Sequence, residues 1–390
     1  MAVQKTYAEI NEKIRKGQAV VVTAEEIISI VEDQGAEAAA EKVDVVTTAT
    51  FGPMCSSGVF LNFGHTDPPI RMKKVWLNDV QAYAGIAAVD AYLGATEESE
   101  TPSGSALYGG AHVIQELLEG RRVHLSAVGT GTDCYPLREW ESDITLEELN
   151  EAILFNPRNA YQNYAAATNT SDETLYTYMG VLLPHAANVT YSTSGELSPL
   201  LNDPEYRTLG IGTRIFLGGA IGYIAGPGTQ HNPSRERLPN GVPVGGAGTL
   251  SVTGNLKEMS PDFIQAAVFE KYGVSMFVGI GVPIPVLDAD MVRRLAVRDA
   301  DIYTTLVDYG VASRNRPTLA KVNYAQLKSG HISLNGRQIP TAPLSSMKKA
   351  RKIAGILGDW IRAGKFFLQE PAERLPLQKS IRPLDAKGGR

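Results

Sequence analysis

The fold of this chain is constrained most by two short apolar runs. Each run is followed by a glycine-containing turn that carries a cysteine. The β-branched residues 43–46 predict a buried strand, which a Gly-Pro pair ends shortly before Cys55. Residues 123–128 predict a second strand, and Cys134 lies in the turn after it. Elsewhere predicted strands alternate with helical segments. The sequence therefore favours an α/β fold with a largely parallel or mixed sheet, flanking helices and glycine-rich central loops.

The similar positions of the two cysteines suggest one shared site. In a parallel α/β sheet the loops at the carboxyl ends of the strands face one crevice, so we expect Cys55 and Cys134 to meet there. Backbone N–H groups of a turn rich in glycine and serine can stabilise a thiolate, which is the reactive form of cysteine. A free cysteine is also often a small buried apolar residue, so a structural role stays open for each.

Length and composition describe an ordinary globular chain. Its 390 residues are 43% hydrophobic and 20% charged, which is enough for a large core. We expect a single large α/β region over 1–370, with a candidate subdivision near 140–200, and a frayed tail at 371–390. The net charge of −5, with both signs intermixed, argues against nucleic acid as a partner.

The cysteine count and the N-terminus indicate the compartment. Two cysteines are too few for a disulfide framework and fit a reducing cytosol. The N-terminus has no apolar signal core, and no run approaches the roughly 18 apolar residues of a membrane span. We therefore expect a cytoplasmic chain with no membrane partner.

Helix starts are marked by hydroxyl residues at the N-cap position. A glutamate follows three residues after each of Thr6, Thr23 and Thr145. This spacing is a capping box and predicts that a helix begins at each threonine. The third helix is predicted to run to about residue 155. The Ser-Pro-Asp sequence at 260–262 predicts a helix that ends at about residue 273. Residues 345–363 predict an amphipathic helix.

The sequence has 38 glycines, and many of them gather between 195 and 254, where Arg214 and His231 are the chemically useful side chains. No P-loop ending and no strand–GxGxxG–helix context occur there, so a nucleotide site is not supported. Arg214 is a candidate clamp for a substrate carboxylate, and His231 is a candidate acid or base. For each of them an ordinary structural role is about as well supported.

Residues 156–164 form a polar and aromatic segment without a helical pattern. Its asparagines and tyrosines suit a loop that binds a substrate or a partner. A surface loop with satisfied asparagine side chains explains the composition equally well.

The residue inventory limits the chemistry to thiols. Two cysteines cannot ligate a four-cysteine iron–sulfur cluster, and the sequence has no CxxC, no HExxH and no paired histidines for zinc. We therefore expect no metal site and no cofactor bound by this chain. A cysteine pair can instead hold sulfur as a persulfide and supply two electrons by closing to a disulfide.

Three motifs resemble those of a known family. They are Phe-Gly-Pro-Met-Cys-Ser-Ser-Gly at 51–58, Gly-Thr-Gly-Thr-Asp-Cys-Tyr-Pro at 129–136, and the glycine-rich segments 212–219 and 226–231. They resemble the homocysteine biosynthesis proteins, the L-aspartate semialdehyde sulfurtransferases of methanogens and other anaerobes, over about residues 5–370. The resemblance implies that Cys55 and Cys134 are the functional cysteines.

The resemblance also implies a reaction. Aspartate semialdehyde becomes homocysteine when sulfur replaces its aldehyde oxygen and the carbon is reduced by two electrons. One cysteine would deliver sulfur as a persulfide, the other would resolve the intermediate, and a Cys55–Cys134 disulfide would account for two electrons. Arg214 would hold the substrate carboxylate and His231 would donate a proton.

The family further implies a small ferredoxin-like iron–sulfur protein as partner. Sulfide or a persulfide donor and an external reductant would also be needed. Some members carry a regulatory CBS domain, which we do not expect in this chain. A homo-oligomer is compatible with the sequence.

Two other classes of protein stay open. A cysteine hydrolase or acyltransferase would use Cys55 as nucleophile and His185 or His231 as base, with no reductant and no need for the second cysteine. A non-catalytic ligand-binding or assembly protein would tolerate serine at both cysteine positions.

Overall fold

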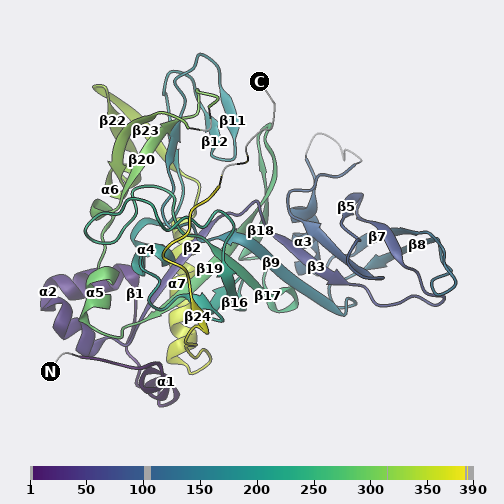
Figure 1. The fold of residues 1–390 in the computed structure, drawn as a ribbon, viewed down its shortest axis with the longest axis horizontal. Helices are drawn as coiled ribbons and strands as arrows, with labels where there is room; N and C mark the ends of the chain where they lie inside the picture. Colours follow the sequence, from purple (N-terminus) through teal and green to yellow (C-terminus); the bar gives the residue numbers. More distant parts are fainter. Residues whose placement is uncertain (1–2, 101–106, 314, 383, 385–390) are drawn as a thin grey trace.

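A curled sheet of ten strands forms the centre of this computed structural model, which describes residues 3–100, 107–313, 315–382 and 384 (Figure 1). The predicted α/β class with a mixed sheet and flanking helices is confirmed, although most strand pairs are antiparallel. Among the described residues, the one parallel pair of this sheet is β1 with β2. In spatial order the strands are β1 Val21–Thr23, β2 Val45–Pro53, β19 Gly273–Pro285, β15 Arg214–Leu217, β16 Ala220–Pro227, β17 Leu250–Asn255, β9 Glu151–Asn159, β3 Gly58–Asn62 and β6 Asp90–Gly94, with β18 Ile264–Phe269 also beside β19.

The sheet partly closes on itself at a short turn. β2 ends at Pro53 and β3 begins at Gly58, yet six steps of strand pairing separate these two strands. In a flat sheet, six steps of about 4.8 Å would place them about 29 Å apart. The connecting chain reaches at most about 18 Å. The sheet must therefore curl until β2 and β3 approach each other at this turn, which carries Cys55.

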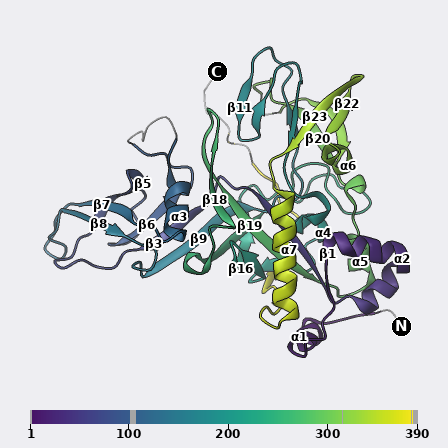
Figure 2. The ribbon, with the colours of Figure 1, turned by 180° about the vertical axis from the view of Figure 1, so that it is seen from behind.

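Glycines on β19 allow a helix to pack closely on the sheet. The helix α7 (Met347–Arg362) covers β2 and β19 (Figure 2). A Cβ atom at Gly279 would lie 2.8 Å from Ile353 of α7, and one at Gly281 would lie 2.9 Å from it. These distances are shorter than real Cβ contacts, so a larger residue at either position would force the Ile353 side chain to shift. The amphipathic helix predicted at 345–363 is confirmed.

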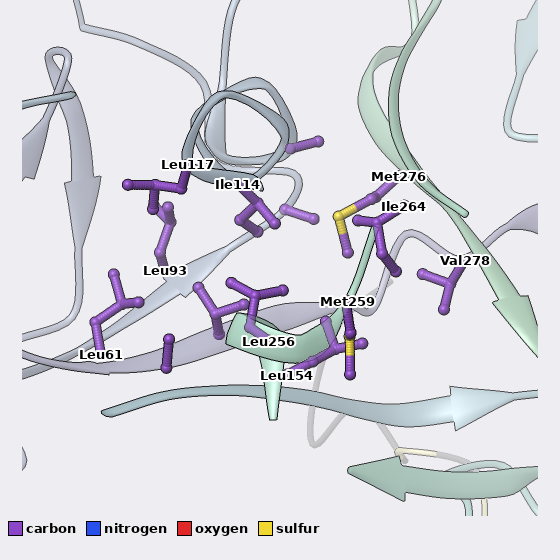
Figure 3. Close-up of a cluster of buried hydrophobic side chains, with 14 of the residues drawn as sticks. Leu61, Leu93, Ile114, Leu117, Leu154, Leu256, Met259, Ile264, Met276 and Val278 are labelled. Carbon is purple, nitrogen blue, oxygen red and sulfur yellow. The ribbon is translucent and has the colours of Figure 1, made fainter. Parts of the chain in front are cut away.

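The helix α3 (Gly110–Leu118) covers the largest part of the core. Ile114 and Leu117 of this helix point toward side chains from β3, β6, β9 and β18 (Figure 3). Each fully buried leucine or isoleucine contributes about 1.5–3 kcal/mol relative to exposure. A second apolar cluster lies between the sheet and the helices α1 (Tyr7–Arg15), α2 (Ala24–Lys42), α5 (Ala289–Leu295) and α7.

Four smaller groups of strands accompany the central sheet among the described residues. One is a four-stranded sheet in the order β5 Val80–Ala82, β4 Met72–Leu77, β7 Val123–Gly129 and β8 Glu139–Ile144. A six-stranded sheet combines strands from two distant parts of the chain, in the order β21 Thr318–Asn323, β20 Tyr303–Asp308, β10 Ala166–Thr168, β13 Val189–Tyr191, β23 Arg337–Pro343 and β22 His331–Leu334. Two small pairs are β11 Leu175–Thr177 with β12 Gly180–Leu182, and β14 Gly210–Ile211 with β24 Glu373–Arg374. Short helices lie between these strands, namely α4 Pro199–Asn202, α6 Tyr324–Lys328, η1 Gly195–Leu197, η2 Leu256–Glu258 and η3 Asp299–Asp301.

Two of the predicted capping boxes begin helices and the third does not. Thr6 and Thr23 cap α1 and α2, as predicted. The N–H and the hydroxyl of Thr145 both donate to the Glu148 carboxylate, but the chain then enters strand β9, so the helix predicted to residue 155 is wrong. The helix predicted at 260–273 is also wrong, because β18 lies there. At residue 151 pairing with the distant strands β17 and β3 outweighs the local helix signal, and at 264–269 pairing with the next strand, β19, does so.

Much of the C-terminal segment that the sequence predicted to be a frayed tail is docked on the sheet. β24 pairs with β14, and the N–H of Leu375 donates to the Leu209 carbonyl at 3.1 Å. Lys379 exchanges hydrogen bonds with Ser234. The prediction of fraying from 371 is therefore wrong up to residue 379. Residues 383 and 385–390 lie outside the described part.

Asp44 ties α1 to the start of β2 and makes the fold sensitive to acid. Its carboxylate is 1% exposed and accepts hydrogen bonds from Lys5 (2.9 Å), Lys13 (2.7 Å) and the N–H of Val20 (3.0 Å). Burial by itself raises the pKa of Asp44, but these hydrogen bonds together outweigh burial and lower the pKa below its usual value. The stabilisation is therefore present above the unfolded-state pKa and is lost as the pH falls through the folded-state pKa.

We expect Asp44→Asn to lower the free energy of unfolding by about 2–3 kcal/mol near neutral pH, since it leaves buried donors poorly paired. Urea unfolding at several pH values measures the difference from wild type, which should shrink below about pH 4. Asp172→Asn is the matched control, because the Asp172 side chain is 93% exposed. A difference that stays constant with pH would contradict the assignment.

Candidate active site

Cys55 lies in the turn that closes the curled sheet. The N–H and the hydroxyl of Ser57 both donate to the Met54 carbonyl, at 3.0 and 2.7 Å, and shape residues 54–57 into a tight turn. The thiol is half-buried, and its Sγ lies 3.1 Å from the hydroxyl oxygen of Ser275 on β19. The strand β2 runs through Gly52 to Pro53 instead of breaking before them, so Cys55 follows directly from a paired strand.

Asn156 at the end of β9 holds this turn in place. Its side chain is fully buried; Nδ2 donates to the Ser57 hydroxyl at 2.6 Å, and Oδ1 accepts from the Ser56 hydroxyl at 3.2 Å. The same Oδ1 accepts from the N–H of Arg158 at 2.8 Å. The polar segment at 156–164, a candidate binding loop in the sequence, is therefore part strand, and its first residues contact the Cys55 turn.

We expect Asn156→Ala to weaken both the fold and the activity. It removes three hydrogen bonds and leaves the Ser57 hydroxyl and the Arg158 N–H without this partner, which costs about 1–3 kcal/mol of unfolding free energy. Activity should fall about tenfold, because the thiol loses its fixed position. Denaturant unfolding and steady-state kinetics measure the two effects. The exposed Asn150→Ala is the control, and equal behaviour of the two variants would contradict the role of Asn156.

Two tyrosines lie near the thiol, Tyr161 in the loop after β9 and Tyr272 in the turn between β18 and β19. The rings of Tyr161 and Tyr164 meet edge to face, with centroids 5.0 Å apart. Burial raises the pKa of Tyr161, and the nearby Arg158 opposes that rise without cancelling it. Burial also raises the pKa of Tyr272, and the negative charge of a Cys55 thiolate adds to the rise at both Tyr161 and Tyr272. These phenols stay protonated near neutral pH and can donate hydrogen bonds.

A small pocket opens beside the turn. It lies between the end of β2, the start of the loop after β9 and the segment that leads into α4. Met54, the residue before Cys55, and Tyr161 form one side of it. The other lining residues are mainly small or carry hydroxyl groups: Thr50, Ala160, Ser192, Thr193, Ser198 and Pro199.

Cys134 belongs to a different sheet. It is exposed on the turn between β7 (Val123–Gly129) and β8 (Glu139–Ile144), which pair with β4 (Met72–Leu77) and β5 (Val80–Ala82). Tyr135, next to it, stacks on His65 with ring centroids 6.1 Å apart. Figures 1 and 2 show this sheet projecting at one end of the molecule, away from β2 and β19.

The two cysteines therefore do not share the edge of one parallel sheet, as the strand pattern predicted. Their strands lie in separate sheets, and both thiols are free. A disulfide needs Cα atoms within about 7 Å of each other. Formation of a Cys55–Cys134 bond thus requires movement of the projecting sheet, or the arrival of Cys134 from a second copy of the chain.

Arg214 lies toward the opposite end of β19 from Cys55. Its guanidinium carbon lies 5.1 Å from the centroid of the Phe366 ring, and it lines a small surface pocket with Pro283. Ser275, the partner of Cys55, and Pro283 are separated by about 26 Å of strand. The structure does not bring Arg214 to the thiol, so its role as a carboxylate clamp there has no structural support.

His231 is fully buried and has two backbone partners. Its Nδ1 lies 3.0 Å from both the amide nitrogen and the carbonyl oxygen of Thr249, and its Nε2 lies 3.1 Å from the Pro376 carbonyl oxygen. Burial lowers the pKa of His231, which is therefore neutral near pH 7. This histidine fastens the C-terminal segment to the glycine-rich centre. The structure does not support the proton-donor role assigned to it from the sequence.

The hydrolase alternative also lacks a base at the thiol. His185 is exposed and pairs with Asp172 at 3.5 Å. Among the described residues, no histidine hydrogen-bonds to Cys55, whose hydrogen-bond partner is Ser275. The described part of the chain holds no group of three or more histidine, cysteine, aspartate or glutamate side chains arranged for a metal. None of its described helices has the length and apolar character to cross a membrane.

Comparison with known proteins agrees with the resemblance seen in the motifs. The family model described as "homocysteine biosynthesis enzyme, sulfur-incorporation" matches residues 19–368. A protein of Methanosarcina acetivorans named L-aspartate semialdehyde sulfurtransferase is 54% identical over 98% of this chain and 74% of its own length. A protein of the same name from Methanocaldococcus jannaschii is 54% identical over 96% of this chain and 74% of its own length.

A more distant relative is an uncharacterized protein of Methanothermobacter thermautotrophicus, 30% identical over 83% of this chain and 72% of its own length. No solved structure matches the chain. The family match covers both cysteine turns, the glycine-rich centre and the helix α7. The chain therefore belongs to the family of homocysteine biosynthesis enzymes that incorporate sulfur.

Proposed function

We propose that this enzyme converts L-aspartate semialdehyde into L-homocysteine, the activity that the names of its 54% identical relatives imply. The observation that carries the proposal is the placement of Cys55. Its half-buried thiol lies in a turn fixed by Asn156, beside a pocket with hydroxyl-bearing walls. Nucleophilic thiols need this combination of access and fixed position.

The chemistry of the conversion sets the reactants. When sulfide sulfur replaces the aldehyde oxygen, water leaves and the carbon is at the oxidation level of a thioaldehyde. Two electrons and two protons then reduce this group to the CH₂–SH of homocysteine. If the sulfur arrives instead as the outer sulfur of a persulfide, two further electrons are consumed in the transfer. The reaction therefore needs a reductant in every case.

A cysteine pair supplies two electrons in each cycle. One thiolate adds to the sulfur of the thioaldehyde, the C=S π bond breaks, and its electron pair takes up a proton at carbon, which gives a mixed disulfide of cysteine with homocysteine. The second thiol attacks the cysteine sulfur of that mixed disulfide, and homocysteine leaves as its thiolate while the Cys55–Cys134 disulfide closes. An external donor must then reduce the disulfide. We propose a small ferredoxin-like iron–sulfur protein for this task, since this chain supplies two cysteines and no cluster of its own.

An assay of the purified chain tests the proposal. L-aspartate semialdehyde, sulfide and a reductant such as dithiothreitol or titanium citrate are combined without oxygen, and homocysteine is measured by mass spectrometry. We expect homocysteine only when all three are present. Homocysteine formation without any reductant would contradict the need for external electrons. Absence of product even after addition of an anaerobic cell extract would refute the proposed reaction.

A further inference from the structure

We propose that Arg158 binds the α-carboxylate of the substrate and so selects an amino-acid aldehyde for the Cys55 thiol. This inference rests on the proposed function and adds the residue that recognises the substrate class. Three observations carry it: the attachment of Arg158 to the Cys55 turn, the way its guanidinium is held, and the lack of a carboxylate partner for it among the described residues.

The backbone of Arg158 is joined directly to the turn that carries the thiol. Its carbonyl accepts from the hydroxyl of Ser56, the residue after Cys55, at 3.2 Å. Its N–H donates to Asn156 Oδ1 at 2.8 Å, and the same oxygen accepts from the Ser56 hydroxyl. These hydrogen bonds fix Arg158 relative to Cys55, although the two residues are far apart in the sequence.

Thr229 holds the guanidinium at one of its three nitrogen atoms. The Arg158 Nε donates to Thr229 Oγ1 at 3.0 Å. Thr229 is itself fixed on β9, because its N–H donates to the Pro157 carbonyl at 2.7 Å. Since Nε is engaged, a carboxylate meets Arg158 at the other edge, where Nη1 and Nη2 present two N–H groups that match its two oxygens.

The charge of Arg158 has no counter-charge within the described part of the chain. Its side chain is half-buried, and no described carboxylate forms an ion pair with it. Two other partly buried arginines show the ordinary arrangement: Arg207 pairs with Asp288 at 2.6 Å, and Arg294 pairs with Glu205 at 3.2 Å. A half-buried cation has lost part of its hydration, so the lack of an ion pair favours binding of an anionic ligand.

Tyr161 lies close to both groups that the substrate would connect. Burial raises the pKa of its phenol, the charge of Arg158 opposes this rise, and a thiolate at Cys55 adds to it. Both charges act on one phenol because the guanidinium and the thiol lie near it. A substrate beside Tyr161 can therefore reach both, since only three carbon–carbon bonds separate its aldehyde carbon from its carboxylate carbon.

The other cations of this region are engaged by tyrosine rings. The Lys271 Nζ lies 4.3 Å from the centroid of the Tyr176 ring and 3.3 Å from its hydroxyl oxygen. The Arg316 guanidinium carbon lies 4.0 Å from the centroid of the Tyr309 ring. Such contacts satisfy part of the charge of each side chain. Arg158 is thus the cation best placed to bind a carboxylate at the thiol.

Removal of the carboxylate from the substrate and of the charge from the protein tests the pairing. The truncated substrate is 3-aminopropanal, which is aspartate semialdehyde without its carboxylate. Wild type should prefer aspartate semialdehyde in kcat/KM by about 10- to 100-fold, as expected for hydrogen bonds between charged groups. Arg158→Gln should lose this preference and leave turnover of 3-aminopropanal unchanged. Arg337→Gln, exposed on β23, is the matched control and should keep the preference.

Binding of L-homoserine tests the same contact without turnover. This alcohol keeps the carboxylate and the ammonium group and lacks the reactive aldehyde. Calorimetry should show that Arg158→Gln raises its Kd about tenfold or more, and that Arg158→Lys raises it less, because lysine keeps the charge and loses the paired N–H groups. Thr229→Val removes the partner of Nε and should also raise this Kd. It replaces Arg158→Gln if the melting curve of that variant shows no folded protein.

Two results would overturn the assignment: no binding of L-homoserine by wild type, or an equal preference for aspartate semialdehyde in wild type and Arg158→Gln. The two proposals can fail separately. Arg158-dependent binding of L-homoserine by a chain that makes no homocysteine would refute the proposed function and keep the binding residue. Homocysteine formation with a preference that Arg158→Gln does not change would refute the binding residue and keep the function.

Discussion

Cys55→Ser is expected to lower the rate of homocysteine formation roughly a thousandfold or more, since a serine hydroxyl is a weak nucleophile and cannot hold or resolve sulfur. The fold should be unchanged, because serine fits the volume of the thiol and can keep the hydrogen bond to Ser275. Rates of product formation and thermal melting curves measure the two effects. The measurement uses sulfide and reductant in excess.

The matched control for Cys55→Ser is Ser275→Ala. It removes the hydrogen-bond partner of the thiol and keeps the thiol itself. We expect a loss of activity of about tenfold or less, since one neutral hydrogen bond contributes about 1 kcal/mol. If Cys55→Ser retained full activity, the thiol would have no chemical role, and the non-catalytic alternative would regain support.

Cys134→Ser is expected to reduce turnover about a hundredfold or more while leaving the first bond-forming step intact. Without the second thiol the mixed disulfide between Cys55 and the substrate sulfur cannot be resolved. Mass spectrometry of the variant under limiting reductant should therefore show this adduct on Cys55. A small thiol such as dithiothreitol should partly restore turnover, because it can attack the adduct in place of Cys134. Full activity without added thiol would exclude the pair.

A mixture of the two inactive variants shows how Cys134 reaches Cys55. In the described conformation Cys134 lies on the projecting sheet of β4, β5, β7 and β8. Recovery of activity on mixing Cys55→Ser with Cys134→Ser chains would mean that one copy provides each thiol. No recovery would mean that the projecting sheet moves within one chain.

The sequence predicted local structure correctly where that structure depends only on residues close together in the chain. The capping boxes at Thr6 and Thr23 begin helices, and Gly35 interrupts α2, where its φ of 81° departs from the helix. Backbone preferences of this kind need no distant partner.

The same kind of signal failed at Thr145. The local hydrogen bonds of the capping box form, but residues 151–159 then pair with β17 and β3. Their burial alternates along the first six residues of β9, as expected for a strand with one face in the core. The sequence itself does not alternate, because residues 152–155 are all apolar; the structure buries Ala152 and Leu154 and exposes Ile153.

The candidate site shows what the sequence alone determined. Both cysteines were found on glycine-containing turns after strands, the family was identified from the motifs, and residues 156–164 were marked as a candidate binding segment. Each of these features is carried by a short run of residues. Arg214 and His231 were chosen because glycines surround them, but glycine density in the sequence does not report which side chains face a pocket.

Only the tertiary structure decided which residues act together. The curl of the ten-stranded sheet brings β2 and β3 to one turn and places Cys55, Ser275, Asn156 and Tyr161 around it, although they are up to 220 positions apart. It also leaves Cys134 in a separate sheet and turns Thr50 toward a pocket. These outcomes depend on the pairing of strands distant in sequence, and that pairing is set by burial over the whole sheet and not by any local preference.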